Sequence, residues 1–193
     1  HNFYIDSNSI IYDAIRTVQY TKDKTYENQI NKWVCEKIVY YISLIGPENK
    51  VYIAFDGVSP VAKLDQQRNR RYKTWHTNDF LEKLENDKKE MWDTTAITPG
   101  SPFMKNLSQY LNTYFKSKFT KMDVIVSSSD MVGEGEHKIY QYIRDNKKYH
   151  RDTTTLIYGL DADLIMLCLN HLRISKNIYL YRETPEFVKS IDK

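Results

Sequence analysis

The sequence predicts an α/β fold, in which a mostly parallel sheet lies between two layers of helices. Short, continuous runs of apolar residues recur along the chain, and such runs are typical of strands that are buried on both faces. Segments with the apolar spacing of a helix separate these runs, which indicates strands joined by helical crossovers. The 193 residues are enough for one domain of this kind, so we expect a single domain over residues 1–193.

The expected strands are short, apolar or aromatic, and bounded by polar residues or glycine. The second of them, for example, ends at Asp56-Gly57, a pair that often follows a strand. In chain order the predicted strands are Asn2–Asp6, Val51–Phe55, Val124–Val126, Thr154–Tyr158 and Ile178–Tyr181.

Helical periodicity and helix-end signals predict the segments between the strands. A helix over Glu27–Ile45 is expected to stop at Gly46-Pro47. Ser101 is a candidate N-cap, with Pro102 at the first helical position. Residues 61–92 are highly charged and predict one or two exposed helices. The other expected helices run from the first strand to about Tyr20, from the loop at Gly133 to Asn146, from Pro102 to about Lys118, and over Asp161–His171.

Composition excludes several classes of protein. The chain carries 28 Lys+Arg and 25 Asp+Glu, a net charge of +3, and this even balance argues against a disordered charged tail. Its longest apolar stretches are far shorter than the roughly 20 residues of a membrane span, so no membrane partner is expected. Cys35 and Cys168 lie within apolar helical patterns and predict buried, unpaired thiols of a reducing, intracellular compartment, with cytoplasm and nucleus left open.

Acidic residues follow several of the predicted strands at their carboxyl ends, where parallel sheets bind ligands. Asp6 and Asp56 close the first two strands, and the other acids follow the third and fourth strands. The candidate set is Asp6, Asp56, Glu134, Glu136, Asp161 and Asp163. Clustered carboxylates repel one another, and hard divalent cations remove that penalty. Oxygen ligands with little His or Cys predict Mg²⁺ or Mn²⁺, and two such ions suit phosphodiester chemistry.

Each of these acids also has a purely structural interpretation. Asp56-Gly57 is a common turn, and Asp161 is a plausible helix N-cap. Glu134 and Glu136 favour a helix dipole at its N-terminus. Being two residues apart, they would point to nearly opposite sides of a regular helix, unless the glycines at 133 and 135 bend the backbone.

A basic segment follows the second strand closely. If residues 63–73 are helical, one face presents Lys63, Gln67, Arg70 and Arg71. Two guanidinium groups, an ammonium and an amide on one face predict a socket for a terminal phosphate. The alternative is a solvated charged face. The segment begins seven residues after Asp56 and must lie close to the carboxylates, which favours the phosphate socket.

Taken together, these motifs resemble the 5′→3′ exoribonuclease (XRN) family. The matching stretches occur in the family's order and run nearly end to end. They are Phe55–Val58 with Ala62, Lys63 and Gln66–Arg71, then Ile97–Met104, Gly133–Lys138 and Tyr158–Leu167.

This resemblance implies a PIN/FEN-like 5′ nuclease fold and the removal of mononucleotides from single-stranded RNA with a 5′ monophosphate. It assigns catalytic metal binding, with two Mg²⁺ or Mn²⁺ ions, to the candidate carboxylates. It assigns 5′-phosphate binding to Lys63, Gln67, Arg70 and Arg71, and so to the 61–92 segment. Tyr12 stands where the family has a base-stacking His, and an aromatic ring can still stack.

The resemblance further implies that the chain is the first part of a longer catalytic region. The family's opening segment before the first strand is absent here, and a further metal-binding Asp would lie beyond Lys193. Two other functions stay open. One is a flap or 5′ nuclease that acts on DNA, and the other is a catalytically silent RNA-end-binding or scaffold module.

Overall fold

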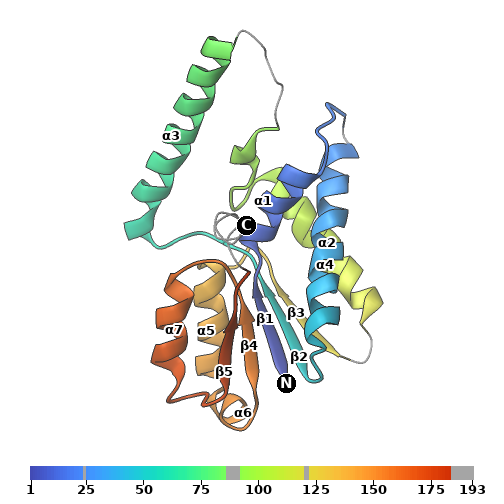
Figure 1. Ribbon diagram of the computed structural model, residues 1–193, viewed down its shortest axis with the longest axis vertical. Helices are drawn as coiled ribbons and strands as arrows, with labels where there is room; N and C mark the ends of the chain where they lie inside the picture. The colour runs from blue at the N-terminus through green and yellow to red at the C-terminus, as the bar shows by residue number, and fades with distance from the viewer. Residues whose placement is uncertain (24, 86–91, 120–121, 184–193) are drawn as a thin grey trace, which may run out of the picture.

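The computed structural model describes residues 1–23, 25–85, 92–119 and 122–183, and it confirms the α/β prediction. The sheet has the strand order β3-β2-β1-β4-β5, and every pair of neighbouring strands is parallel (Figure 1). The strands are β1 (Asn2–Asp6), β2 (Lys50–Ala54), β3 (Asp123–Ser127), β4 (Thr155–Tyr158) and β5 (Ile178–Tyr181).

Two helical layers cover the sheet because side chains alternate along each strand. Phe3 and Ile5 of β1 belong to one hydrophobic core, which lies under α1, α2 and α4, whereas Tyr4 belongs to a second core under α5 and α7 (Figure 1). The helices of these layers are α1 (Asn8–Thr17), α2 (Thr25–Ile45), α4 (Pro102–Lys118), α5 (Gly135–Asp145), the short α6 (Lys147–Arg151) and α7 (Asp163–His171).

Local end signals account for most helix boundaries. The Ser101 hydroxyl accepts a hydrogen bond from the backbone N–H of Met104 at 3.2 Å, which confirms it as the N-cap of α4. The helix α1 ends at Thr17, three residues before the expected Tyr20, because the chain becomes extended at Val18. The helix α2 begins at Thr25 rather than Glu27, since the Asp23 carboxylate accepts from the Thr25 N–H at 2.9 Å.

The charged segment forms one long helix, α3 (Val61–Glu85), which projects away from the sheet (Figure 1). Most of its described side chains are exposed, as the composition predicts. The prediction of helix up to residue 92 is only partly confirmed. Residues 86–91 lie outside the described residues, and Trp92 precedes a 3₁₀ turn, η1 (Thr94–Ala96), whose start is capped by the Asp93 carboxylate.

The strand order defines where a ligand is expected. From β1 the chain moves outward to β2 and β3, and it then returns to β4 on the other side of β1. Such a change of direction opens a crevice at the carboxyl ends of the two strands. Asp6 at the end of β1 and the residues after β4 therefore meet at this point.

The structure also bears on membrane spans and on the two cysteines. Within the described ranges, no helix is both long and apolar enough to cross a membrane. Both cysteines are unpaired, and Cys35 is buried as predicted. Cys168 is only half-buried, because it packs against the second core from α7 without being enclosed by it; its sulfur is 2.8 Å from the Tyr140 hydroxyl.

Candidate active site

The candidate acids gather at the carboxyl ends of the strands, and we call this group the acidic edge: Asp6, Asp56, Glu134, Glu136, Asp161 and Asp163. Asp6, at the end of β1, lies at its centre. One carboxylate oxygen, Oδ1, is buried and has no hydrogen-bond partner among the described residues. Burial raises the pKa of Asp6 well above its usual range, and the charges of Asp56, Glu136 and Asp161 raise it further. Residues from β1, from the ends of β2 and β4, and from α5 thus converge electrostatically on one carboxylate.

Asp56 is held from two sides by hydrogen bonds. The Asn8 side-chain amide donates to Oδ2 at 2.6 Å, and the Gly135 N–H donates to Oδ1 at 2.7 Å. The Asp56 N–H in turn donates to the Asn8 Oδ1 at 3.2 Å. Burial raises the pKa of Asp56, while the Gly135 hydrogen bond opposes this shift. The Asp56 carboxylate is therefore fixed between the start of α1 and the start of α5.

The backbone before α5 brings Glu134 and Glu136 to the same side. Gly133 has φ of +102°, a conformation that favours glycine, and Glu134 is extended (φ −76°, ψ 155°) as the residue that precedes the helix. Because Glu134 lies outside the helix, helical spacing does not separate it from Glu136. Ligand atoms of Glu134, Glu136 and the neighbouring His137 all lie within 4.8 Å of one another.

Asp161 and Asp163 complete the edge after β4. The Asp163 N–H donates to the Asp161 carboxylate at 3.1 Å, so Asp161 does fold back on the start of α7. Its position still serves the acidic edge, because ligand atoms of Glu136, Asp161 and Asp163 lie within 4.8 Å of one another. Burial, followed by the charges of Asp161 and Glu134, raises the pKa of Glu136 to about 7.

Close approach of the backbone to Asp6 requires Gly135. A Cβ atom at position 135 would lie 2.5 Å from the Asp6 Oδ1 and 3.4 Å from the Ala54 carbonyl oxygen. Real side chains essentially never tolerate the first of these distances. The glycine therefore allows the first turn of α5 to pack against the end of β1.

The donor set fits hard divalent cations. Its members supply carboxylate oxygens, one of them is buried without a partner among the described residues, and burial, reinforced by mutual repulsion, raises the pKa of Asp6 and Glu136. Oxygen-rich sites of this type suit Mg²⁺ or Mn²⁺, whose charge offsets the repulsion. The residues that the structure brings together for this purpose are Asp6, Asp56, Glu134, Glu136, Asp161 and Asp163.

The start of α3 is tied to this acidic edge. The Lys63 ammonium donates to the Glu134 carboxylate at 2.8 Å, and this hydrogen bond raises the pKa of Lys63. One turn further along α3, the Gln67 amide donates to the Ser59 hydroxyl at 2.5 Å. Two of the predicted phosphate-binding side chains are therefore already oriented by contacts at the base of the helix.

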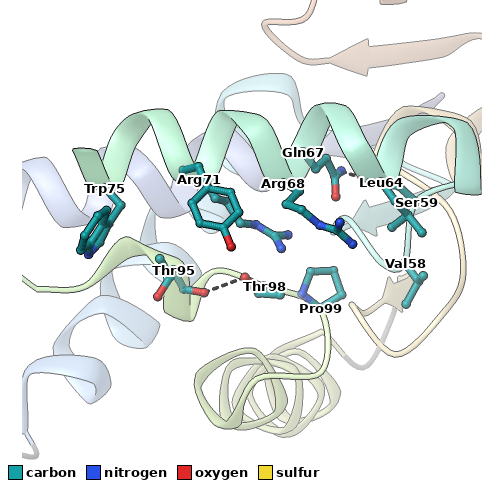
Figure 2. Close-up of a pocket in the computed structure, with 11 residues that line it drawn as sticks. Val58, Ser59, Leu64, Gln67, Arg68, Arg71, Trp75, Thr95, Thr98 and Pro99 are labelled. Atoms are coloured by element: carbon teal, nitrogen blue, oxygen red, sulfur yellow. Dashed lines mark hydrogen bonds between the residues drawn. The ribbon is translucent and has the colours of Figure 1, made fainter. Parts of the chain in front are cut away.

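A groove of about 570 Å³ runs between α3 and the segment around η1 (Figure 2). Arg68 and Arg71 extend from α3 toward Thr98 and Pro99 on the opposite wall. The groove is lined by Val58, Ser59, Leu64, Gln67, Arg68, Arg71, Tyr72, Trp75, Thr95, Thr98 and Pro99.

The predicted phosphate socket is only partly reproduced by this groove. Gln67 and Arg71 line it, Arg70 does not, and Arg68 contributes a guanidinium that was not predicted. The lining follows the spacing of Leu64, Arg68, Arg71 and Trp75, which is the next face of the helix. Lys63 does not line the groove either, and phosphate binding by Lys63, Gln67, Arg70 and Arg71 stays a prediction.

Tyr12, the candidate base-stacking residue, is half-buried on α1 and packs against the core beneath α1 and α2. It is not among the residues that line the groove. Its stacking role therefore stays a prediction as well.

Sequence reasoning missed two residues that shape the site. Asn8 stands two residues after Asp6, and a carboxamide so close to a strand-end acid was a signal that could have been used. Lys138 stands four residues after Glu134, a spacing that allows an ion pair between the two side chains on a helix. In the structure Lys63 pairs with Glu134 instead, and the buried Lys138 donates to the Phe55 and Ser128 carbonyl oxygens. Burial lowers the pKa of Lys138 to about 8.

Comparison with known proteins gives a consistent result. Residues 1–184 match the family model described as "XRN 5'-3' exonuclease N-terminus". The chain is similar to 5'-3' exoribonuclease 1 of Saccharomyces cerevisiae, with 38% identity over 88% of this chain and 12% of the relative. It is 36% identical to 5'-3' exoribonuclease 1 of Schizosaccharomyces pombe, over 96% of this chain and 15% of the relative.

The same pattern holds for a second type of relative. The chain is 32% identical to 5'-3' exoribonuclease 2 of Schizosaccharomyces pombe, over 94% of this chain and 21% of the relative. It therefore spans between 12% and 21% of the length of these curated relatives.

Proposed function

Because the chain belongs to the XRN 5'-3' exonuclease family, whose N-terminal model it matches over residues 1–184, we propose that it carries the metal site of a 5′→3′ exoribonuclease. Its substrate is single-stranded RNA with a 5′ monophosphate, and its product is a mononucleotide. The reaction is hydrolysis of the first phosphodiester by a two-metal mechanism.

One observation carries the proposal most strongly. The acidic edge is in direct contact with α3, the basic helix, through the hydrogen bond from Lys63 to Glu134. A site for cations and a site for a terminal phosphate therefore adjoin, as a nuclease that starts from a 5′ end requires. A binding module would need only the basic half, and the mutually repelling acids would then cost stability without a purpose.

The carboxylates of the acidic edge would hold two Mg²⁺ or Mn²⁺ ions. When bound, these ions supply charge stabilisation for the attacking and leaving oxygens of the phosphodiester. The chain's own residues keep the ligands in place: Asn8 and the Gly135 N–H fix Asp56, and the extended Glu134 backbone sets its carboxylate beside Glu136. Half-exposed Lys63 is positioned to meet an incoming phosphate.

Selection of the 5′ monophosphate is assigned to Lys63, Gln67, Arg70 and Arg71. Guanidinium groups bind phosphate oxygens through two parallel hydrogen bonds, and the ammonium adds a point charge. Support comes from the placement of Gln67 and Arg71 in the groove beside Ser59, close to the Lys63–Glu134 contact. This arrangement suits a chain end more than a DNA flap threaded past the site.

A single RNA prepared with three different 5′ ends tests the proposal. The RNA carries a 5′ monophosphate, a 5′ hydroxyl or a 5′ triphosphate, and a DNA strand of the same sequence serves as the fourth substrate. With Mg²⁺, we expect rapid loss of the monophosphate RNA alone. Equal rates on the three RNA ends would refute the phosphate socket, and preferential loss of DNA would favour a flap nuclease.

Two broader proposals accompany this function. We propose that residues 1–193 form one nuclease domain, since a single sheet carries both cores and the acidic edge. We also propose a reducing, intracellular compartment, supported by the free thiols of Cys35 and Cys168.

A further inference from the structure

Lys138 is a charged residue buried beside the acidic edge. It lies on α5, one turn after Glu134, and only 7% of its surface is exposed. Lysine is rarely buried to this degree unless its ammonium is fully engaged. The burial of this charge therefore needs a structural reason. It also leaves the ammonium poorly placed to contact a phosphate.

The ammonium of Lys138 joins two segments that precede the site. It donates to the Phe55 carbonyl oxygen at 2.8 Å and to the Ser128 carbonyl oxygen at 2.7 Å. Phe55 immediately precedes Asp56, and Ser128 begins the turn that leads from β3 toward Glu134. One side chain on α5 is thus hydrogen-bonded to the backbone of the two segments that lead to Asp56 and to Glu134.

Backbone hydrogen bonds join the same two segments. The Gly57 N–H donates to the Gly133 carbonyl oxygen at 2.8 Å, and the Gly133 N–H donates to the Val58 carbonyl oxygen at 3.0 Å. The Lys138 charge also acts on the Asp56 carboxylate and favours its ionised form. Lys138 therefore supports both the location and the charge of Asp56.

We propose that Lys138 is a positioning residue of the metal site, which fixes Asp56 relative to Glu134 and Glu136 through its hydrogen bonds to Phe55 and Ser128. It does not touch the substrate or the ligand atoms of the metals. This inference rests on the proposed function, because it presumes that those carboxylates bind divalent cations. Groups that orient metal ligands from behind typically contribute about 10–100-fold to metal affinity.

The test measures Mn²⁺ binding to the 193-residue chain by calorimetry, without RNA. Lys138→Met keeps the length of the side chain and removes the charge and all three donors. We expect Mn²⁺ affinity to fall about 10–100-fold. With 5′-monophosphate RNA at saturating Mn²⁺, KM should stay at the wild-type value, whereas a direct phosphate contact would raise it.

Lys50→Met provides a matched control. Lys50 has a largely buried side chain, 16% exposed, but it pairs with Asp123 at the opposite edge of the sheet. The control should lose stability and keep wild-type Mn²⁺ affinity. Equal Mn²⁺ affinity in wild type and Lys138→Met would overturn the inference, and so would an equal loss in Lys50→Met and Lys138→Met.

A second variant covers a failure of Lys138→Met to fold. Lys138→Arg keeps the charge and the donors, but its planar fork cannot place one nitrogen between the same two carbonyl oxygens. We expect a folded protein with weakened Mn²⁺ binding, and unchanged Mn²⁺ affinity would contradict a positioning role. If the wild-type chain binds no Mn²⁺ at all, the proposed metal site itself fails, which separates the two outcomes.

Discussion

Asp161 makes a structural contact in addition to its proposed role as a metal ligand. Its carboxylate accepts the Asp163 N–H at the start of α7, as a cap would, and it also lies within 4.8 Å of ligand atoms of Glu136 and Asp163. The contact with the Asp163 N–H is therefore compatible with the proposed role of Asp161 as a metal ligand, although Ala162 is the N-cap residue of α7. A carboxylate has enough lone pairs to accept one backbone hydrogen bond and still bind a cation.

Asp161→Ala is predicted to abolish RNA cleavage and to spare RNA binding. The substitution removes a proposed metal ligand while leaving the basic helix intact, so turnover should fall by several orders of magnitude. Single-turnover rates and fluorescence-anisotropy titrations with 5′-monophosphate RNA provide the two measurements. Asp152→Ala, an exposed acid just before β4, is the control and should cleave normally. Turnover of Asp161→Ala near the wild-type rate would show that the site is wrongly assigned.

Arg71 is the predicted phosphate-binding arginine that lines the groove, whereas Arg70 does not line it. Arg71→Ala should reduce the preference for 5′-monophosphate over 5′-hydroxyl RNA by about 10–100-fold, the usual effect of a lost charge-assisted contact. The ratio of kcat/KM for the two RNAs measures this preference. Arg151→Ala, an exposed arginine at the end of α6, should leave the ratio unchanged. A wild-type ratio in Arg71→Ala would remove Arg71 from the phosphate site.

At the scale of elements, α6 is joined to the central strand by His150. Its Nε2 lies 2.7 Å from the Tyr4 hydroxyl on β1, and its Nδ1 lies 2.9 Å from the Asn146 carbonyl oxygen. A neutral ring satisfies both contacts, with Nδ1–H donating to Asn146 and Nε2 accepting from Tyr4. Burial accordingly lowers the pKa of His150 below its usual 6.5.

His150 is predicted to make stability depend on pH. Since its folded-state pKa is lowered, the unfolded chain binds more protons below pH 6.5. The stabilisation is therefore complete above that pH and is lost as the pH falls through 6.5 toward the folded-state value. The slope contributed by one such group is at most about 1.4 kcal/mol per pH unit.

Urea unfolding of wild type and His150→Gln at pH 7.5 and pH 5.5 measures this contribution. Glutamine can donate and accept hydrogen bonds but does not titrate, so the variant should lose less stability between the two pH values. His76→Gln, which changes an exposed histidine on α3, should retain the wild-type dependence. Identical pH dependence in wild type and His150→Gln would rule out the assigned role.

At the scale of the whole molecule, the strand pattern was highly predictable because the central strands β1, β2 and β4 are largely buried and mostly apolar. Tyr4 and Ile5, for instance, enter opposite cores from adjacent positions. The ends of helices were less predictable, since α1 ends and α2 begins through local contacts at Val18 and Asp23. The short α6 and η1 lack a sufficiently long apolar pattern to reveal them.

The acidic edge could be located from sequence because parallel strands end together, so acids that follow them must converge. Their detailed arrangement could not, because it depends on tertiary contacts. Glu134 meets Glu136 only because it is extended before the helix, and the orientation of Arg68 into the groove depends on where η1 packs. The contacts of Lys138 could not be predicted, since its partners are backbone carbonyl oxygens of two other segments.

The family membership and the contact between the acidic edge and the basic helix both support the proposed chemistry, the stepwise removal of nucleotides from a 5′ end. The identity of the first product tests this most directly. An RNA labelled on its 5′ monophosphate is incubated with the chain and Mg²⁺, and the labelled products are separated by size at early times. We predict that the label appears only as a mononucleotide, and that a chelator prevents its release. Labelled oligonucleotides as first products, or mononucleotide release that persists in chelator, would contradict a metal-dependent 5′→3′ exoribonuclease.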